Sequence, residues 1–293
     1  MIREKSVASR LFDMGNYLFL FLFGLACLFP MIHVVAVSLS NRAASMGGFV
    51  TLWPLGATFQ NYLEILEAGP VYKAFLVSVT RTVLGTSINM GMTVLAAYPL
   101  SKSSEELKGR SVFMWIVLIA MLFNGGLIPW WMVIRNLGLL NSLWALVLPG
   151  ALPIWNVILL MNFFREIPKE LEEAAIIDGA SYWGTLYYVY LPLSVPALAT
   201  LTLFAAVFHW NAWFDGMVLI MDNSKYPIMT FLRTVVVDMN LQILTVNMDD
   251  IYNLSDRSIR AANIVVATVP ILIVYPFLQR YFIHGIRLGA VKG

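Results

Sequence analysis

Long stretches without a charged residue are the feature that most limits what this chain can fold into. No Asp, Glu, Lys or Arg lies between Asp13 and Arg42, or between Arg81 and Lys102. A helix needs about 20 apolar residues to cross the hydrocarbon core of a bilayer. The 293 residues are 59% hydrophobic and only 12% charged, whereas ordinary soluble domains carry roughly 25% charged residues. Water could not solvate so much apolar surface, so the sequence predicts an all-α integral membrane protein.

Six such stretches can be marked as transmembrane helices, within one membrane domain that covers residues 1–293. We expect the spans at about 14–38, 74–100, 111–134, 141–164, 191–221 and 261–280. They leave external loops at 40–72 and 222–260 and a cytoplasmic loop at 165–190. The first apolar run is longer than the roughly 7–15 residues of a signal-peptide core, so we interpret it as a retained span.

The distribution of basic residues predicts the orientation of these spans. An even number of spans places both termini on the same side of the membrane. In the short segments, Lys and Arg concentrate on that side, which is cytoplasmic by the positive-inside rule. The residues concerned are Arg3, Lys5, Arg10, Lys102, Lys108, Arg110, Arg165, Lys169, Arg280, Arg287 and Lys292.

Signatures of catalytic, metal and nucleotide sites are missing from the sequence. It has no G-x-S-x-G, H-E-x-x-H or G-x-G-x-x-G motif, and the three histidines show no ligand spacing. The glycine-containing run at 179–185 lacks the lysine of a Walker A loop. With one cysteine and a net charge of +2, neither a thiolate metal site nor nucleic-acid binding is indicated. We therefore predict no catalytic residue, no metal and no bound cofactor. If the chain pumps a solute, the energy comes from elsewhere.

An ion-coupled secondary transporter is the alternative that the residues leave open. Such a carrier needs ionisable groups within the bilayer, and the spans offer His33, Arg81, His209 and Asp215. These residues lie in different spans or near span ends, and no two form a carboxylate pair. This argues against a self-contained carrier without excluding it, and a membrane-bound enzyme is a third hypothesis.

Several spans are interrupted by residues that disturb helices. Proline removes a backbone donor and kinks a helix, and in lipid the freed carbonyls need protein or water as partners. Two interpretations stay open: ordinary packing of membrane helices, or bent helices around a water-accessible path. The interrupting residues are Asn124, Gly125, Gly126, Pro129, Pro149, Pro153, Pro270 and Pro276.

The loop after the fourth span reads as a helix, a glycine turn and a second helix. Pro168 suits the first turn of a helix, and the acidic residues that follow suit its positive end. Gly179 can take the positive φ that ends this helix, and Ser181 can cap the next. Anionic lipid would repel so acidic a segment, so we interpret the hairpin as one that docks into a groove of another protein.

This hairpin resembles the EAA loop of bacterial ABC-importer permeases. The match rests on the run Glu173-Ala174-Ala175, then Gly179, then Leu191-Pro192, between the fourth and fifth of six expected spans. The C-terminal run 289–293 is similar to the tail of the sugar-permease branch, the relatives of the maltose permease's smaller subunit. The resemblance implies that an ATPase subunit is contacted by Glu173, Ala174, Ala175, Asp178, Gly179, Leu191 and Pro192, and by the tail Gly289, Ala290, Val291, Lys292 and Gly293.

Other runs extend the resemblance over nearly the whole chain. They are Asn61-Tyr62, the runs at 96–100 and 138–142, and two that resemble the subgroup handling complex oligosaccharides or polysaccharides, at 124–129 and 209–214. Within that subgroup, the alginate importer's second permease subunit is the specific match that these runs suggest.

The resemblance implies a carbohydrate importer of the bacterial cytoplasmic membrane. Two permease subunits, homologous but different in sequence, would form the pore, and two ATPase subunits would bind ATP and magnesium. A separate solute-binding protein would deliver the sugar. Tryptophans could stack on sugar rings, although those near span ends are more often interfacial anchors. We expect Trp210, Asn211, Trp213 and Asn124 along the substrate path, with Trp130, Trp131, Trp144 and Trp155 as further stacking candidates.

Overall fold

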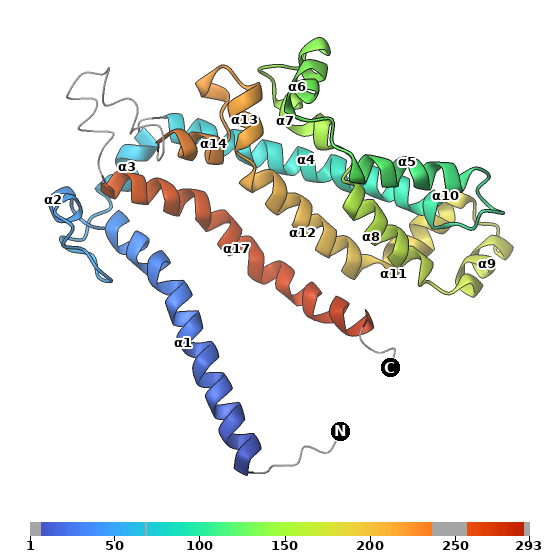
Figure 1. Cartoon of the computed structure of the whole chain (residues 1–293), viewed down its shortest axis with the longest axis horizontal. Coiled ribbons are helices and arrows are strands. Elements are labelled where there is room, and N and C mark those ends of the chain that lie inside the picture. Colours follow the sequence, from blue (N-terminus) through green and yellow to red (C-terminus); the bar gives the residue numbers. More distant parts are fainter. Residues whose placement is uncertain (1–6, 68, 236–256, 290–293) are drawn as a thin grey trace. The chain divides into compact units, whose positions relative to one another are not determined.

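The structure, a computed structural model, describes residues 7–67, 69–235 and 257–289, and in these ranges the regular elements are all helical (Figure 1). Three of the described helices are each long and apolar enough to cross a membrane. They are Ser9–Ser38 within α1 (Val7–Ser38), α4 (Pro70–Ser101), and Arg257–Val274 within α17 (Arg257–Gly289). These helices overlap the stretches expected to span the membrane at 14–38, 74–100 and 261–280.

At the predicted spans 111–134 and 141–164, the described residues form bent pairs of helices. A third bent pair, Tyr182–Leu193 with Val195–Asn211, begins within the predicted loop at 165–190 rather than at residue 191. The described helices give six spans if each pair counts as one. The bends measure 115° between α5 and α6, 45° before α8, and 82° before α12. The predicted span 191–221 is moreover interrupted, because Ala212 takes an extended conformation after α12. The elements are α5 (Arg110–Leu122), α6 (Leu127–Asn136), α7 (Leu143–Val147), η1 (Leu148–Gly150), α8 (Ile154–Arg165) and α12 (Val195–Asn211).

The chain divides into two compact units, of which the first combines residues up to Val71 with residues 234–268. Its described part contains α1, α2 (Arg42–Met46), α3 (Gln60–Glu67) and the beginning of α17. The predicted external loop at 222–260 falls partly, at 236–256, outside the described residues. The core of this unit consists of Ala36, Val37, Val50 and Ala261.

A buried amide ties the segments of the first unit together. The Nδ2 atom of Asn61, on α3, donates to the carbonyl oxygens of Ser38 at 2.7 Å and Ser40 at 3.0 Å. Its Oδ1 atom accepts a hydrogen bond of 3.2 Å from Ser258, on α17. Asn61 therefore satisfies the carbonyls left unpaired where α1 ends.

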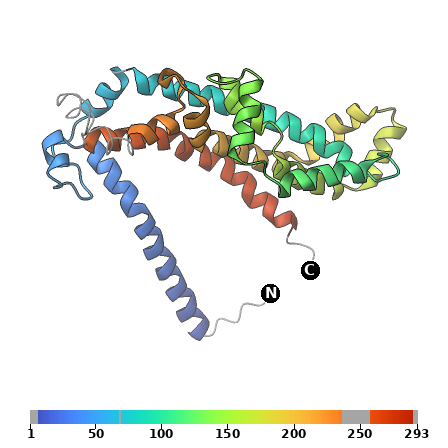
Figure 2. The ribbon, with the colours of Figure 1, turned by 45° about the horizontal axis from the view of Figure 1, so that its top comes forward.

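The second unit comprises residues 72–233 and 269–293, and α4 runs along it. Figures 1 and 2 show α9 and α10 near one end of α4, and α13 and α14 towards the other. Around the first of these ends, Tyr98, Phe164 and Tyr190 form a buried aromatic cluster. The elements are α9 (Lys169–Ile177), α10 (Tyr182–Thr185), a π-helical turn η2 (Leu186–Tyr190), α11 (Leu191–Leu193), α13 (Phe214–Leu219), η3 (Asn223–Lys225) and α14 (Ile228–Arg233).

The helix–turn–helix predicted for the loop after the fourth span is present. Gly179 follows α9 with a φ of +87°, a conformation that glycine adopts without steric cost. The hydroxyl of Ser181 accepts a hydrogen bond of 3.2 Å from the backbone N–H of Gly184 and so caps α10. We call residues 169–185 the hairpin.

Candidate functional site

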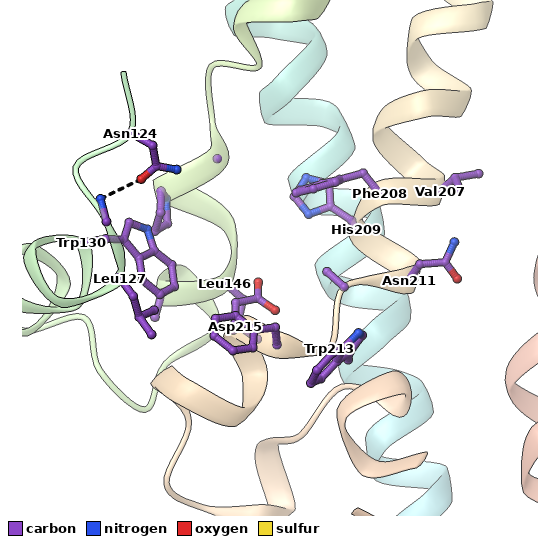
Figure 3. Close-up of a pocket in the computed structure, with 16 residues that line it drawn as sticks. Asn124, Leu127, Trp130, Leu146, Val207, Phe208, His209, Asn211, Trp213 and Asp215 are labelled. Carbon is purple, nitrogen blue, oxygen red and sulfur yellow. Dashed lines mark hydrogen bonds between the residues drawn. The ribbon is translucent and has the colours of Figure 1, made fainter. Parts of the chain in front are cut away.

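An open pocket of about 740 Å³ lies in the second unit where its helices break (Figure 3). Irregular backbone at membrane depth is tolerated only where it is buried in protein or lines a water-filled cavity. The walls come from the break between α5 and α6, from α7 and the turn after it, and from the break between α12 and α13. Lining residues include Asn124, Trp130, Leu146, Phe208, His209, Asn211, Trp213, Phe214 and Asp215.

One face of α4 carries the groups that hold these breaks in place. Ser78, Arg81, Gly85 and Asn89 are spaced three and four residues apart, so they lie in a row on one side of the helix. The side chains of Ser78, Arg81 and Asn89 are buried. The Ser78 hydroxyl accepts a 2.7 Å hydrogen bond from the backbone N–H of Ile228, an otherwise unpaired donor in the first turn of α14.

Asn89 binds the turn that precedes α8. Its Nδ2 atom donates to the carbonyl oxygens of Gly150 at 2.7 Å and Ala151 at 3.1 Å, which the helix break leaves without intrahelical partners. Its Oδ1 atom lies 2.9 Å from Nε2 of His209, on α12. A single amide therefore connects α4 with two walls of the pocket.

Arg81 holds the break between α12 and α13. Its Nη1 atom donates to the carbonyl oxygen of Ala212 and to Oδ1 of Asp215, both at 3.2 Å, and its Nη2 atom pairs with Oδ2 of the same carboxylate. The Arg81 side chain is 1% exposed and that of Asp215 is 21% exposed. A buried guanidinium of this kind needs a paired carboxylate and further acceptors, and this site provides both.

The sequence puts Arg81 and Asp215 in different spans, and the structure brings their side chains together. Arg81 and Asp215 are 134 residues apart in the chain and form an ion pair. His209 joins the same row through Asn89. The signal that could have revealed the row is the regular spacing of polar residues along the span at 74–100. Because these groups are paired with each other, they bind the helices together.

Gly85 leaves the space that His209 occupies. A β-carbon added at Gly85 would lie 2.5 Å from Cε1 and Nε2 of the His209 ring, well inside van der Waals contact. His209 is itself buried, with 1% exposure. The glycine is thus required for close approach of α12 to α4.

The residues predicted for the substrate path do not all reach the pocket. Asn124, Asn211 and Trp213 line it, and in Figure 3 Asn124 lies on the wall opposite α12. Trp210 points elsewhere: it is 6% exposed and packs edge-to-face against Phe75 at a centroid distance of 5.7 Å. Of the other tryptophans that the sequence offered, Trp130 lines the pocket.

Aromatic side chains and two amides contribute to the otherwise largely aliphatic lining of the pocket. Trp130 and Trp213 present large apolar faces, while Asn124 and Asn211 offer both hydrogen-bond donors and acceptors. The guanidinium of Arg233 lies 5.0 Å from the centre of the Trp213 ring, which restrains the orientation of that ring. Such a surface suits a ligand that has both apolar faces and many hydroxyl groups.

Most of the residues that the resemblance assigns to the ATPase contact are accessible. Glu173, Ala174, Asp178, Gly179 and Pro192 are exposed, and Ala175 and Leu191 are half-buried. Beside them Ile177 is 84%, Tyr182 72% and Trp183 68% exposed. Gly289 ends α17, and the rest of the predicted tail, residues 290–293, lies outside the described residues.

Potential metal ligands do not gather in the part of the chain that the structure describes: no three His, Cys, Asp or Glu residues come together there. The single cysteine, Cys27, is free and exposed on α1.

Known proteins are similar to this chain over almost its full length. The chain is 43% identical to the polygalacturonan/rhamnogalacturonan transport system permease protein YtcP of Bacillus subtilis, covering 97% of this chain and 99% of that protein. It is 39% identical to the protein LplC of the same organism, covering 99% and 98%. One chain of a crystallised bacterial ABC transporter involved in the import of the acidic polysaccharide alginate superposes with a TM-score of 0.87 and 35% identity, covering 96% of this chain and all of that chain. Residues 4–288 match the family of binding-protein-dependent transport system inner membrane components, and the chain belongs to that family.

Proposed function

We propose that the chain is the membrane-spanning permease subunit of an ATP-driven importer for oligosaccharides or polysaccharides. The observation that carries this proposal is the full-length agreement, in sequence and in fold, with permease subunits of polysaccharide importers. The pocket supports the assignment, because its aromatic faces and side-chain amides match the apolar faces and hydroxyl groups of a sugar.

In this proposal the pocket is a part of the substrate path. Trp130 and Trp213 stack on sugar rings, and Asn124 and Asn211 exchange hydrogen bonds with hydroxyl groups. The chain forms half of the pore, and a second, homologous permease subunit forms the other half. The ion pair of Arg81 with Asp215 stays intact and holds the wall.

The hairpin is the element that docks onto an ATPase subunit. Its exposed outer surface, with Glu173, Ile177, Tyr182 and Trp183, offers a charged group beside apolar side chains, as a protein interface requires. In this proposal the chain has six spans, counting each bent pair as one, so both termini lie on the same side of a bacterial cytoplasmic membrane. The positive-inside rule supports the cytoplasm as that side, and the hairpin lies there too. The C-terminal tail at 289–293 reaches the same ATPases.

The chain has no ATP site of its own in this assignment. Two partner ATPase subunits bind ATP and magnesium, and a solute-binding protein delivers the saccharide from outside. The external segments at 40–72 and 222–260 face that protein. Closure of the ATPases moves the hairpin, and the hairpin moves the spans.

Purification of the assembled complex tests the proposal. We expect the affinity-tagged chain to retain two ATPase subunits and a second permease, and the complex to hydrolyse ATP faster when binding protein and saccharide are added. Gly179→Val places a β-branched residue at a φ of +87° with no neighbour within 4 Å, so strain in the turn is its direct effect.

Gly179→Val and Glu173→Lys should therefore leave membrane levels normal but weaken ATPase association. Ser104→Lys, an exposed charge change outside the hairpin, is the control and should have no effect. Full ATPase association in both hairpin variants would refute the docking role.

A further inference from the structure

Two neighbouring glutamates of α9 face different environments. Glu173 is exposed and belongs to the outer surface of the hairpin. The side chain of Glu172 is only 13% exposed and pairs with Lys102, whose side chain is 9% exposed. Lys102 follows directly after the last residue of α4, so this ion pair joins the hairpin to the end of α4.

A tyrosine from the segment between the hairpin and α12 completes the contact. The hydroxyl of Tyr190 donates to Oε2 of Glu172 at 2.6 Å and accepts a hydrogen bond of 3.1 Å from Nζ of Lys102. The same ammonium lies 4.4 Å from the ring centres of both Tyr98 and Tyr190. A carboxylate, a hydroxyl group and two aromatic rings therefore surround the Lys102 ammonium.

The hairpin is fixed to α4 at a second point nearby. The hydroxyl of Tyr98, on α4, donates a 3.0 Å hydrogen bond to the carbonyl oxygen of Tyr182, the first residue of α10. Both helices of the hairpin are thus bonded to the same end of α4: α9 through Glu172 and α10 through Tyr182.

The covalent connection from the hairpin to α12 is, in contrast, irregular. Residues 186–190 form a π-helical turn, a feature that often marks functional sites within helices. An 82° bend follows before Val195. A movement of the hairpin can therefore reach α12 through the backbone only by way of the π-helical turn and the bend.

α4 is an uninterrupted helix that ends at Ser101, and its polar row binds the walls of the pocket. From Lys102 to Asn89 the distance along the axis is about 20 Å, at a rise of about 1.5 Å per residue. Coupling between separated sites is carried by rigid elements and by buried ionic and hydrogen-bonded contacts. The ion pair, α4 and its polar row make one such continuous connection.

We propose that Glu172, Lys102 and Tyr190 are positioning residues that transmit movement of the hairpin to α4, and through Asn89 and Arg81 to the pocket. This rests on the proposed function of the hairpin. Glu173 and its exposed neighbours hold the ATPase, whereas Glu172 passes the movement on. Loss of the latch formed by Glu172, Lys102 and Tyr190 separates ATP hydrolysis from transport without releasing the ATPase.

The test measures saccharide taken up per ATP hydrolysed by the complete complex in proteoliposomes. The variants are Glu172→Gln, Lys102→Met and Tyr190→Phe, and the matched control is Glu105→Gln, an exposed glutamate in the loop after α4. We expect ATPase subunits to co-purify normally and the ratio to fall about tenfold in Glu172→Gln and Lys102→Met, within the range of coupling between distant sites. The control should keep the wild-type ratio.

A merely structural role for the latch would lower the amount of complex, and hydrolysis and uptake would fall together with the ratio unchanged. That outcome would overturn the proposal, and so would loss of the ATPase from Glu172→Gln. If Lys102→Met fails to reach the membrane, Tyr190→Phe replaces it in the test. This variant removes only the Tyr190 hydroxyl and keeps the aromatic rings of Tyr98 and Tyr190 beside Lys102. A lower ratio of saccharide to ATP is again the expected result. If the wild-type complex shows no sugar-stimulated ATP hydrolysis, the proposed function is wrong. If the wild-type complex does show it, and Glu172→Gln takes up as much saccharide per ATP as the wild type, only the role of the latch is wrong.

Discussion

Substitution of Gly85 by alanine examines how tightly α12 approaches α4. The added methyl group would lie 2.5 Å from two atoms of the His209 ring and 2.7 Å from a third. The ring cannot move away easily, because it is buried and its Nε2 atom is bonded to Asn89. Overpacking of this kind costs about 1–3 kcal/mol, while the better helix propensity of alanine returns up to about 1 kcal/mol.

Gly91→Ala is the matched control on the same helix. No atom lies within 4 Å of a β-carbon at this position, so only the propensity gain applies. The difference between the two variants isolates the clash, and it should appear as a lower apparent Tm for Gly85→Ala, by roughly 2–4 °C per kcal/mol. Both are measured at one scan rate in detergent, since unfolding of such proteins is often irreversible. Equal Tm values would refute the close approach, and His209→Ala should suppress the defect of Gly85→Ala.

The remaining predictions concern the ion pair, the pocket and the topology. Asp215→Ala leaves Arg81 buried without its carboxylate partner. It should destabilise the protein by about 3 kcal/mol, the lower end of the range for a broken buried ion pair. The double variant Arg81→Met with Asp215→Leu should recover much of that stability in the same thermal assay. Trp213→Ala and Trp130→Ala should each raise the saccharide concentration for half-maximal uptake roughly 2- to 12-fold, as loss of an aromatic contact does; Trp115→Ala, 65% exposed on α5, should not change it. In a Cys27→Ser background, cysteines at Ser104 and Ser181 should react only with cytoplasmic reagent and one at Asn223 only with external reagent, and labelling of Ser181 and Asn223 from one side would contradict six spans.

The sequence predicts local features of the fold well. The membrane class, the three continuous helices and the turn at Gly179 follow from composition, from the spacing of charges and from the backbone preferences of glycine and serine. These signals depend on neighbouring residues, so they can be read from one sequence.

Contacts between distant segments could not be predicted in this way. The spacing of polar residues on α4 can mark the row, but it does not show that Arg81 meets Asp215, or that Asn89 binds the turn after Pro149. For the same reason the sequence does not reveal that Trp210, expected on the substrate path because it falls inside a span, packs against Phe75.

Residue type alone does not show which side of α9 packs against the rest of the unit. The apolar Leu171 is 44% exposed, whereas its acidic neighbour Glu172 turns inward to Lys102. From sequence alone an acidic residue is expected to face solvent unless a partner for it is known. The partner of Glu172, Lys102, is 70 residues away in the chain.

Transport by the purified complex measures the central claim most directly. The chain, a second permease, the ATPases and the binding protein are reconstituted into proteoliposomes and supplied with oligogalacturonides or alginate oligosaccharides as probes. We predict that accumulation of at least one probe requires ATP on the side of the hairpin and binding protein on the opposite side, and that Gly179→Val abolishes it. Accumulation driven by an imposed proton or sodium gradient, without ATP, would contradict the account.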